Sequence, residues 1–147
     1  MNEPAVLAPR VPPPARRLSI VIAGLSSDAH TWNLVFVQLV LEELGHDVRN
    51  LGPCVPDEVV LDVCRKHRPD LLIMASINGH GVHDGKSLIR AIRASPELAL
   101  MPVGIGGMLG TGGADHGVEL LAASFDAVFE EHGDRISLHA YVDSLCR

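Results

Sequence analysis

The chain has 147 residues, 47% of them hydrophobic but only 3% aromatic, so we expect one domain with an aliphatic core. Its formal net charge is −6 and it has no Lys/Arg cluster, which argues against binding to nucleic acid or to an anionic membrane surface. The longest apolar runs have the length of a strand, so no transmembrane helix is predicted.

The first 17 residues differ in composition from the rest of the chain. They contain five prolines and show little hydrophobic periodicity. Such a composition is typical of an extended, poorly ordered segment. We therefore predict a proline-rich tail over residues 1–17 and a folded domain over residues 18–147.

Strand and helix patterns alternate through this domain. The apolar run Leu18–Gly24 predicts a buried strand, and the apolar stripe along 32–44 predicts a helix that stops at Gly45. The same criteria predict strands at His46–Leu51, Asp70–Ala75, Met101–Ile105 and Phe125–Phe129, and helices at about 56–67, 84–94, 115–123 and 135–145. Such alternation predicts parallel strands with helices on both faces of the sheet. The expected fold is a flavodoxin-like (Rossmann-like) α/β domain with five strands in the order 2-1-3-4-5.

Ligands of such sheets bind at the carboxyl ends of the strands, where the strand order reverses. In the order 2-1-3-4-5, the reversal lies between the first and third strands. Three segments follow strands near this point, at 25–31, 76–81 and 106–113, and they are rich in glycine, serine and histidine. We therefore expect a binding site at this edge of the sheet.

The first of these segments contains Asp28-Ala29-His30. A neutral histidine binds a metal through one ring nitrogen, and a carboxylate that holds the proton on the other nitrogen increases its basicity. The same spacing also suits an aspartate that caps the next helix beside a solvent-facing ring. The glycines of the other two segments favour a large ligand, because they leave the backbone without Cβ atoms, although turn geometry also uses glycine.

Three motifs in order resemble those of the cobalamin-binding domain family: Ser27-Asp28-Ala29-His30, Ser76-Ile77-Asn78-Gly79-His80-Gly81 and Gly106-Gly107-Met108-Leu109. The resemblance extends over about 18–129 and is strongest to the small subunit of glutamate mutase, also called methylaspartate mutase. It implies that His30 is the lower axial ligand of cobalt, that Asp28 bonds its other ring nitrogen, and that a slot holds the displaced nucleotide tail. The implied cofactor-binding residues are Ser27, Asp28, His30, Asn33, Ser76, Ile77, Gly79, Gly106 and Gly107.

Some positions depart from the family pattern. Asn33 stands where the pattern has its final glycine, and Ala75 stands where the pattern has the serine that bonds the displaced base, unless Ser76 replaces it through a shifted register. The end of the fifth predicted strand, Glu130-Glu131-His132-Gly133, replaces a loop with Gly-Thr. A relative that has lost cobalamin binding would carry changes of this kind.

The resemblance implies one component of an adenosylcobalamin-dependent mutase that converts glutamate to 3-methylaspartate. The chain lacks the length of a (β/α)₈ barrel, about 250 residues, so a separate large subunit is expected to hold the amino-acid substrate. The chain alone would be inactive and would supply no catalytic residue. Its part would be to ligate and orient the cofactor, which carries the radical chemistry.

Two other functions remain open. The first keeps the cobalamin and makes the chain a corrinoid carrier for methyl transfer or a cobalamin-responsive regulator. The second is a non-cobalamin module such as a phosphoacceptor or flavin domain. A phosphoacceptor needs an acidic residue after the third strand, where this chain has Ser76 or Asn78, and Ser26-Ser27-Asp28 fits poorly as a flavin phosphate loop because it contains an acid.

The cysteines and the other histidines have simpler interpretations. Three cysteines without a CxxC motif or a secretory signal predict reduced thiols in a cytoplasmic protein. Five histidines are predicted to lie at the surface: His46, His67, His116, His132 and His139.

Overall fold

The computed structural model describes residues 16–25, 32–76, 81–107, 120–130 and 135–146. The described residues form a five-stranded sheet in the order β2-β1-β3-β4-β5, and each neighbouring pair of strands is parallel. The strands are β1 (Ser19–Gly24), β2 (Asp47–Asn50), β3 (Leu71–Ser76), β4 (Val103–Gly107) and β5 (Ala127–Glu130), and the helices are α1 (Trp32–Glu43), α2 (Asp57–His67), α3 (Gly81–Ala94) and α5 (Arg135–Leu145). The predicted fold class and strand order are confirmed.

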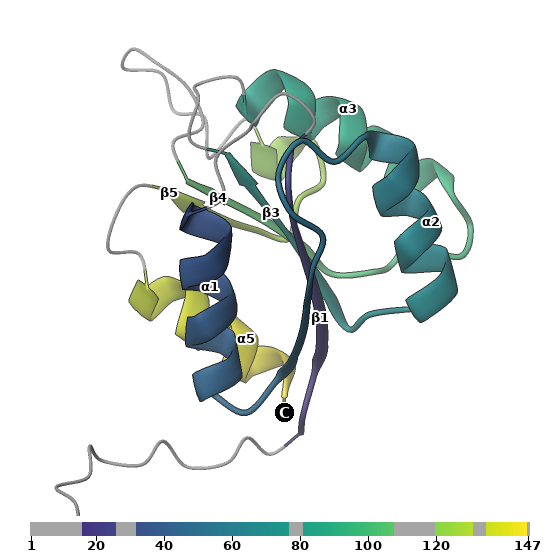
Figure 1. The fold of residues 1–147 in the computed structure, drawn as a ribbon. Coiled ribbons are helices and arrows are strands. Elements are labelled where there is room, and N and C mark those ends of the chain that lie inside the picture. Colours follow the sequence, from purple (N-terminus) through teal and green to yellow (C-terminus); the bar gives the residue numbers. More distant parts are fainter. Residues whose placement is uncertain (1–15, 26–31, 77–80, 108–119, 131–134, 147) are drawn as a thin grey trace, which may run out of the picture.

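Helices cover both faces of the sheet. Figure 1 shows α1 and α5 on one face, which we call the α1/α5 face, and α2 and α3 on the other, the α2/α3 face. Side chains of β1 alternate between the two faces: Ile20 and Ile22 join the hydrophobic cluster under α1 and α5, and Val21 and Ala23 join the one under α2 and α3. Both clusters are mostly aliphatic, as the composition predicts.

Helix α1 ends where the sequence predicts. Gly45 has a φ of 95°, the left-handed conformation that glycine adopts without strain. The amide of Gly45 donates to Glu42 O at 3.0 Å, and the amide of His46 donates to Leu41 O at 3.2 Å. This pair of bonds is a Schellman motif, which satisfies the last carbonyls of the helix and turns the chain into β2.

Three predicted boundaries near the site are wrong. The fourth strand begins at Val103 instead of Met101, because Met101 donates its amide to Leu98 O in a turn and Pro102 has no amide to donate. It continues through Gly107, so Gly106 and Gly107 belong to the strand instead of a loop. Helix α3 begins at Gly81, three residues before the predicted start.

The prediction that His46 lies at the surface is wrong, because this residue is only 5% exposed. Its Nδ1 accepts a hydrogen bond from the amide of Leu18 at 3.1 Å, so the ring completes the start of β1. Burial lowers the pKa of His46, and the positive charge of Arg17 lowers it further. The imidazole therefore acts as a neutral acceptor inside the fold.

Some predicted segments lie wholly or partly outside the residues that the structure describes. Residues 1–15 of the predicted tail and most of the predicted helix at 115–123 lie outside them. None of Cys54, Cys64 and Cys146 forms a disulfide. Among the described helices, none combines the length and apolar character needed to cross a membrane.

Candidate functional site

Three small residues lie next to each other at the carboxyl edge of the sheet. The strand register pairs Gly24 of β1 with Ala75 of β3, and Ala75 with Gly106 of β4. Ile22 and Ile73, two residues earlier in their strands, belong to the cluster on the α1/α5 face, so alternation places the three small residues on that face. We call Gly24, Ala75 and Gly106 the bare row, because its largest side chain is a methyl group.

The neighbouring helices are centred on other strands. Helix α1 packs mainly on β2 and β1, and helix α5 packs on β5. Ala75 and Gly106 lie on the two strands between these helices. The bare row therefore lies between the strands on which the two helices are centred, and it has no side chain larger than a methyl group.

Phe129 borders the bare row on the β5 side. It pairs with Gly106, and a Cβ on Gly106 would lie 3.2 Å from the carbonyl oxygen of Phe129. A Cβ on Gly104, one step down the same face, would lie 3.0 Å from the Phe129 ring. On the helix side, Tyr141 contacts this ring with the two ring centroids 5.9 Å apart. Gly104 and Gly106 thus lie close to Phe129, to its ring and to its backbone respectively, and Phe129 and Tyr141 together form an aromatic wall beside the bare row.

Backbone hydrogen bonds fix the point at which β1 leaves the sheet. The amide of Leu25 donates to Ala75 O at 3.1 Å, and the amide of Gly24 donates to Gly52 O at 2.9 Å. The carbonyl of Gly24 accepts from the amide of Val55 at 3.3 Å. The segment 26–31, with the predicted cobalt ligand His30, therefore starts from a position that β3 and the segment after β2 both hold.

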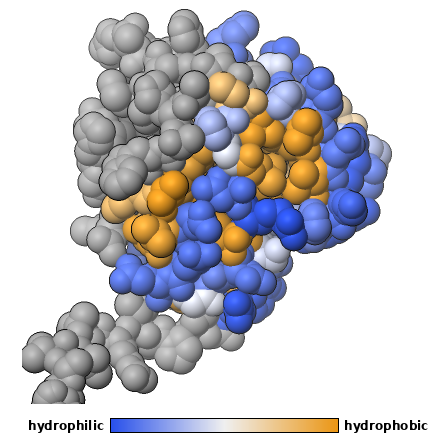
Figure 2. All heavy atoms as spheres, viewed as in Figure 1, coloured by the Kyte–Doolittle hydropathy of each residue, from blue (hydrophilic) through white to orange (hydrophobic). Residues whose placement is uncertain are grey.

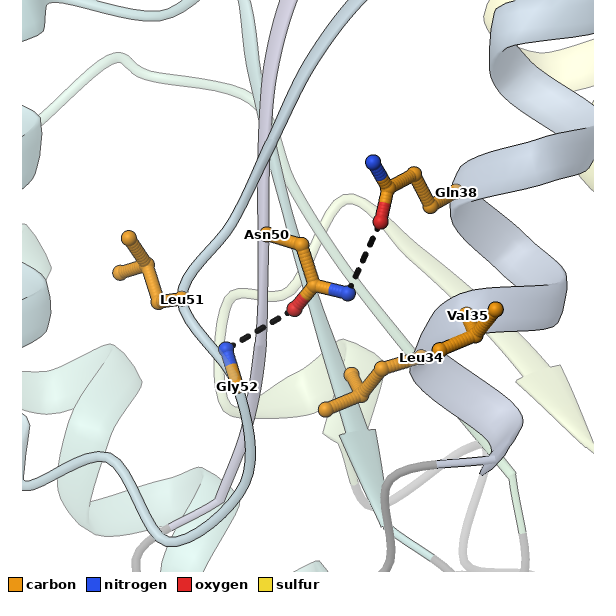
Figure 3. A pocket seen from close by; sticks show the side chains of 6 residues that line it. All are labelled: Leu34, Val35, Gln38, Asn50, Leu51 and Gly52. Atoms are coloured by element: carbon orange, nitrogen blue, oxygen red, sulfur yellow. Dashed lines mark hydrogen bonds between the residues drawn. The ribbon is translucent and has the colours of Figure 1, made fainter.

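A groove lies beside this point, between α1 and the end of β2. Six residues line it, and its volume is about 410 Å³: Leu34, Val35, Gln38, Asn50, Leu51 and Gly52. Figure 3 shows Asn50 in the middle, with its side-chain nitrogen bonded to Gln38 Oε1 at 3.1 Å and its oxygen bonded to the amide of Gly52 at 2.8 Å. We call this space the amide groove.

The surface of α1 continues the apolar wall of the amide groove. Val35 lines the groove and is also one of three exposed hydrophobic side chains on the outer surface of α1, with Phe36 and Leu39. Figure 2 shows this hydrophobic surface over α1, next to hydrophilic residues. The groove is therefore open on its outer side, with one apolar wall and one polar wall.

Acidic groups occupy the helix starts on the α2/α3 face. Burial raises the pKa of Asp57, at the start of α2, against the hydrogen bond it accepts from Ser87 Oγ at 3.2 Å. The nearby carboxylates of Glu58 and Asp84 raise this pKa as well. This negative charge disfavours an anion at the helix starts, although helix N-termini otherwise attract anions.

The predicted site residues divide between described and undescribed parts of the chain. Gly106 lies in the bare row, Gly107 pairs with Ser76 one step further along β4 and β3, and Asn33 lies in the first turn of α1. The other predicted site residues lie outside the described residues: Ser27, Asp28, His30, Ile77 and Gly79. The ligand role of His30 and the partner role of Asp28 thus stay predictions. Among the described residues, no group of three or more His, Cys, Asp or Glu could hold a metal ion.

The sequence interpretation missed the amide groove and the aromatic wall. Asn50 and Gly52 form a local turn in which the asparagine side chain accepts from the backbone two residues on, a pattern typical of Asn-x-Gly. That signal was present in the sequence. No sequence pattern predicts the roles of Gln38 and Phe129, because these roles depend on contacts between distant parts of the chain.

Known proteins share the sequence pattern and the fold of this chain. The model of the B12 binding domain family matches residues 18–137. The glutamate mutase sigma subunit of Treponema denticola is 28% identical over 74 residues, which are 50% of this chain and 53% of that protein. The glutamate mutase sigma subunit of Fusobacterium nucleatum is 35% identical over 65 residues, which are 44% of this chain and 48% of that protein. The matched stretch spans about half the length of these curated relatives.

Solved structures of two kinds share the fold. The monomethylamine corrinoid protein of Methanosarcina barkeri superposes with a TM-score of 0.70 at 17% identity, covering 84% of this chain and 57% of that chain. A response regulator from Desulfuromonas acetoxidans superposes with a TM-score of 0.65 at 20% identity, covering 86% of this chain and 94% of that chain. At these identities the likeness establishes the fold alone, and function depends on the site.

Proposed function

The chain belongs to the B12-binding domain family, and from this premise we propose that it is the small subunit of an adenosylcobalamin-dependent carbon-skeleton mutase. The proposed reaction is the conversion of glutamate to 3-methylaspartate, with a separate barrel subunit that holds the amino acid. The likeness to two glutamate mutase sigma subunits supports this choice within the family.

The observation that carries the proposal is the bare row. A cofactor that brings a nucleotide tail against a sheet needs backbone without side chains at the strand ends, and Gly24, Ala75 and Gly106 provide such a floor on neighbouring strands. A Cβ on Gly106 would crowd the backbone of Phe129 at 3.2 Å, so this position accepts only glycine without a shift of β5. The small size of these three neighbouring residues is what a cobalamin lying against this edge would need.

In the proposed site, one ring nitrogen of His30 would ligate the cobalt, and Asp28 would accept a hydrogen bond from the protonated nitrogen of the same ring. Asp28 thereby fixes the tautomer and makes the ring a stronger ligand. The hydrogen bonds of Gly24 and Leu25 to Gly52 and Ala75 give this loop a fixed starting point. Such support matters because a metal ligand must keep its geometry within a fraction of an ångström.

The division of labour follows from these roles. When bound, adenosylcobalamin supplies the radical that removes a hydrogen atom from the substrate. The chain's own residues ligate the metal and hold the nucleotide tail against the bare row. The large subunit is proposed to bind glutamate and to close the reaction space against water.

Titration of the full chain with adenosylcobalamin, followed by assay with a glutamate mutase large subunit, tests the proposal. We expect cobalamin to bind, and 3-methylaspartate to form only when both proteins and the cofactor are present. Binding without mutase activity, together with activation of a corrinoid methyltransferase, would assign the chain to methyl transfer. No binding of cobalamin, even with the large subunit present, would exclude both functions.

A phosphoacceptor function has less support at the same edge. Strand β3 ends with Ala75 and Ser76, and the segment 76–81 contains neither Asp nor Glu. A receiver-like module needs a carboxylate there to accept the phosphoryl group. The likeness to response regulators in fold therefore does not extend to this chemistry.

A further inference from the structure

The amide groove lies next to the end of β1, as one hydrogen bond and one adjacency in sequence show. The carbonyl oxygen of Gly52, at one end of the groove, accepts a hydrogen bond of 2.9 Å from the amide of Gly24 in the bare row. Leu34 and Val35, on the opposite wall, lie in the first turn of α1, directly after the segment that contains His30. The described residues on both sides of the segment 26–31, which contains the predicted ligand His30, thus adjoin this groove.

The hydrogen-bonding groups of the groove match a neutral amide. Asn50 Nδ2 donates to Gln38 Oε1, and Gln38 Nε2 donates to Glu42 Oε2 at 3.2 Å. Each side-chain amide has two N–H groups and two acceptor lone pairs, so each keeps one N–H for another partner. A primary carboxamide, with one carbonyl and two N–H groups, could accept from Asn50 or Gln38 and donate to their oxygens.

Charge argues against an ionised occupant. None of the six residues that line the groove carries a charge, and Glu42 is bonded to Gln38 at its edge. A carboxylate or phosphate would enter without a compensating cation, at a cost in desolvation. The volume of about 410 Å³ lies within the range of small-molecule sites, roughly 300–1,000 Å³.

We propose that the amide groove holds a carboxamide side chain from the rim of the corrin ring, with Gln38 and Asn50 as its hydrogen-bond partners and Leu34 and Val35 against its methylene groups. The inference rests on the proposed cobalamin binding and adds a contact beside the cobalt ligand. Gln38 and Asn50 would set the rotation of the ring about the bond between cobalt and His30. Gly52 suits the groove floor because no atom lies within 4 Å of where its Cβ would be, so the space stays open.

Equilibrium titration of four proteins with two corrinoids tests this contact. The proteins are the wild-type chain and the variants Gln38→Leu, Asn50→Asp and Leu39→Ala, and the corrinoids are hydroxocobalamin and cobinamide, which keeps the rim carboxamides but lacks the nucleotide tail. Leu39→Ala is the matched control, because Leu39 is exposed on the same helix and does not line the groove. Spectral change at fixed protein concentration gives the dissociation constant.

We expect Gln38→Leu and Asn50→Asp to raise the dissociation constant about five- to tenfold for both corrinoids, the loss typical of one or two neutral hydrogen bonds. Leu39→Ala should leave it unchanged. Equal affinity of Gln38→Leu and the wild type would overturn the inference while leaving the proposed function intact. A loss seen with hydroxocobalamin but absent with cobinamide would also overturn it, by assigning the groove to the nucleotide tail. A wild-type chain that binds neither corrinoid would overturn the proposed function itself.

Discussion

At the amino edge of the sheet, acidic side chains bond directly to the backbone where strands begin. Asp70 accepts the amide of Ser19 at 2.8 Å, and Asp126 accepts the amide of Val103 at 2.8 Å. At the carboxyl edge of the same strands, the bare row has no polar side chain, and Gly106 lies close to the backbone of Phe129. The two edges therefore differ in kind: side-chain hydrogen bonds hold the amino edge, and small residues without such bonds form the centre of the carboxyl edge, where we propose the ligand.

Arg93 is the centre of the amino edge. Its guanidinium donates to the carbonyls of Ala99, Met101 and Ser124 and forms a 2.7 Å ion pair with Asp126. These bonds join the end of α3 to the segments that precede β4 and β5. Asp126 in turn contacts β4, because it accepts a hydrogen bond from the amide of Val103.

The largest effect on stability is therefore expected from Arg93→Ala. We predict a loss of about 2–3 kcal/mol in the free energy of unfolding, because several charge-assisted hydrogen bonds are removed together while the partly exposed pair with Asp126 contributes little. Denaturant unfolding measures this loss. Arg90→Ala, at an exposed position on the same helix, is the matched control and should change the free energy by less than about 0.5 kcal/mol. A loss as small as that of the control would remove the distinction between the two edges.

A substitution in the bare row should mainly weaken cobalamin binding, whereas Arg93→Ala mainly lowers the free energy of unfolding. Gly106→Val puts a branched side chain where even a Cβ would lie 3.2 Å from Phe129 O. We predict about tenfold weaker cobalamin binding, on the order of 1.4 kcal/mol, in a chain that still folds but loses some stability because β5 must shift. Ile105→Val, which shortens a side chain on the α2/α3 face, should cost about 1 kcal/mol of stability and leave cobalamin affinity unchanged. The reverse outcome, with Ile105→Val weakening binding more than Gly106→Val, would place the ligand on the other face.

The smallest effect concerns the pH dependence of the amino edge. Burial and Arg17 lower the pKa of His46 below its ordinary value of 6.5, so the unfolded chain binds a proton more readily than the folded chain. The stability that the neutral ring provides is then complete above about pH 6.5 and is lost as the pH falls through the lowered folded pKa. Unfolding curves from pH 7.5 to 5 should show this loss in the wild type and a smaller one in His46→Gln. Equal slopes for both proteins would show that His46 does not titrate as its burial requires.

The sequence predicts the sheet well because periodicity and strand alternation report burial directly. The runs at 18–24 and 70–75 became β1 and β3 within one residue, and Gly45 ended α1 as expected. The predicted start of β4 was wrong because a buried apolar residue need not lie in a strand. Met101 packs in the core while its backbone forms a turn. His46 was wrong because a single histidine has no pattern that distinguishes a buried acceptor from a surface ring.

The candidate site is harder to predict from sequence, because it depends on which residues share a face of the sheet. Glycine-rich segments locate the edge of the sheet, but they do not tell which glycines lie in a strand and share a face. The strand register gives this information. It places Ala75, which departs from the family pattern, in one row with Gly24 and Gly106. Because this pairing is regular, Ser76 lies one residue further, at the position that pairs with Gly107.

The central claim is that this edge holds a cobalamin through His30. Electron paramagnetic resonance of the chain loaded with cob(II)alamin tests it most directly, using protein labelled with ¹⁵N in its histidines. We predict a two-line splitting of the cobalt signal from one labelled nitrogen in the wild type, and its loss in His30→Ala. A three-line splitting that persists in the labelled wild type, as expected for a ¹⁴N base of the cofactor itself, would contradict the claim.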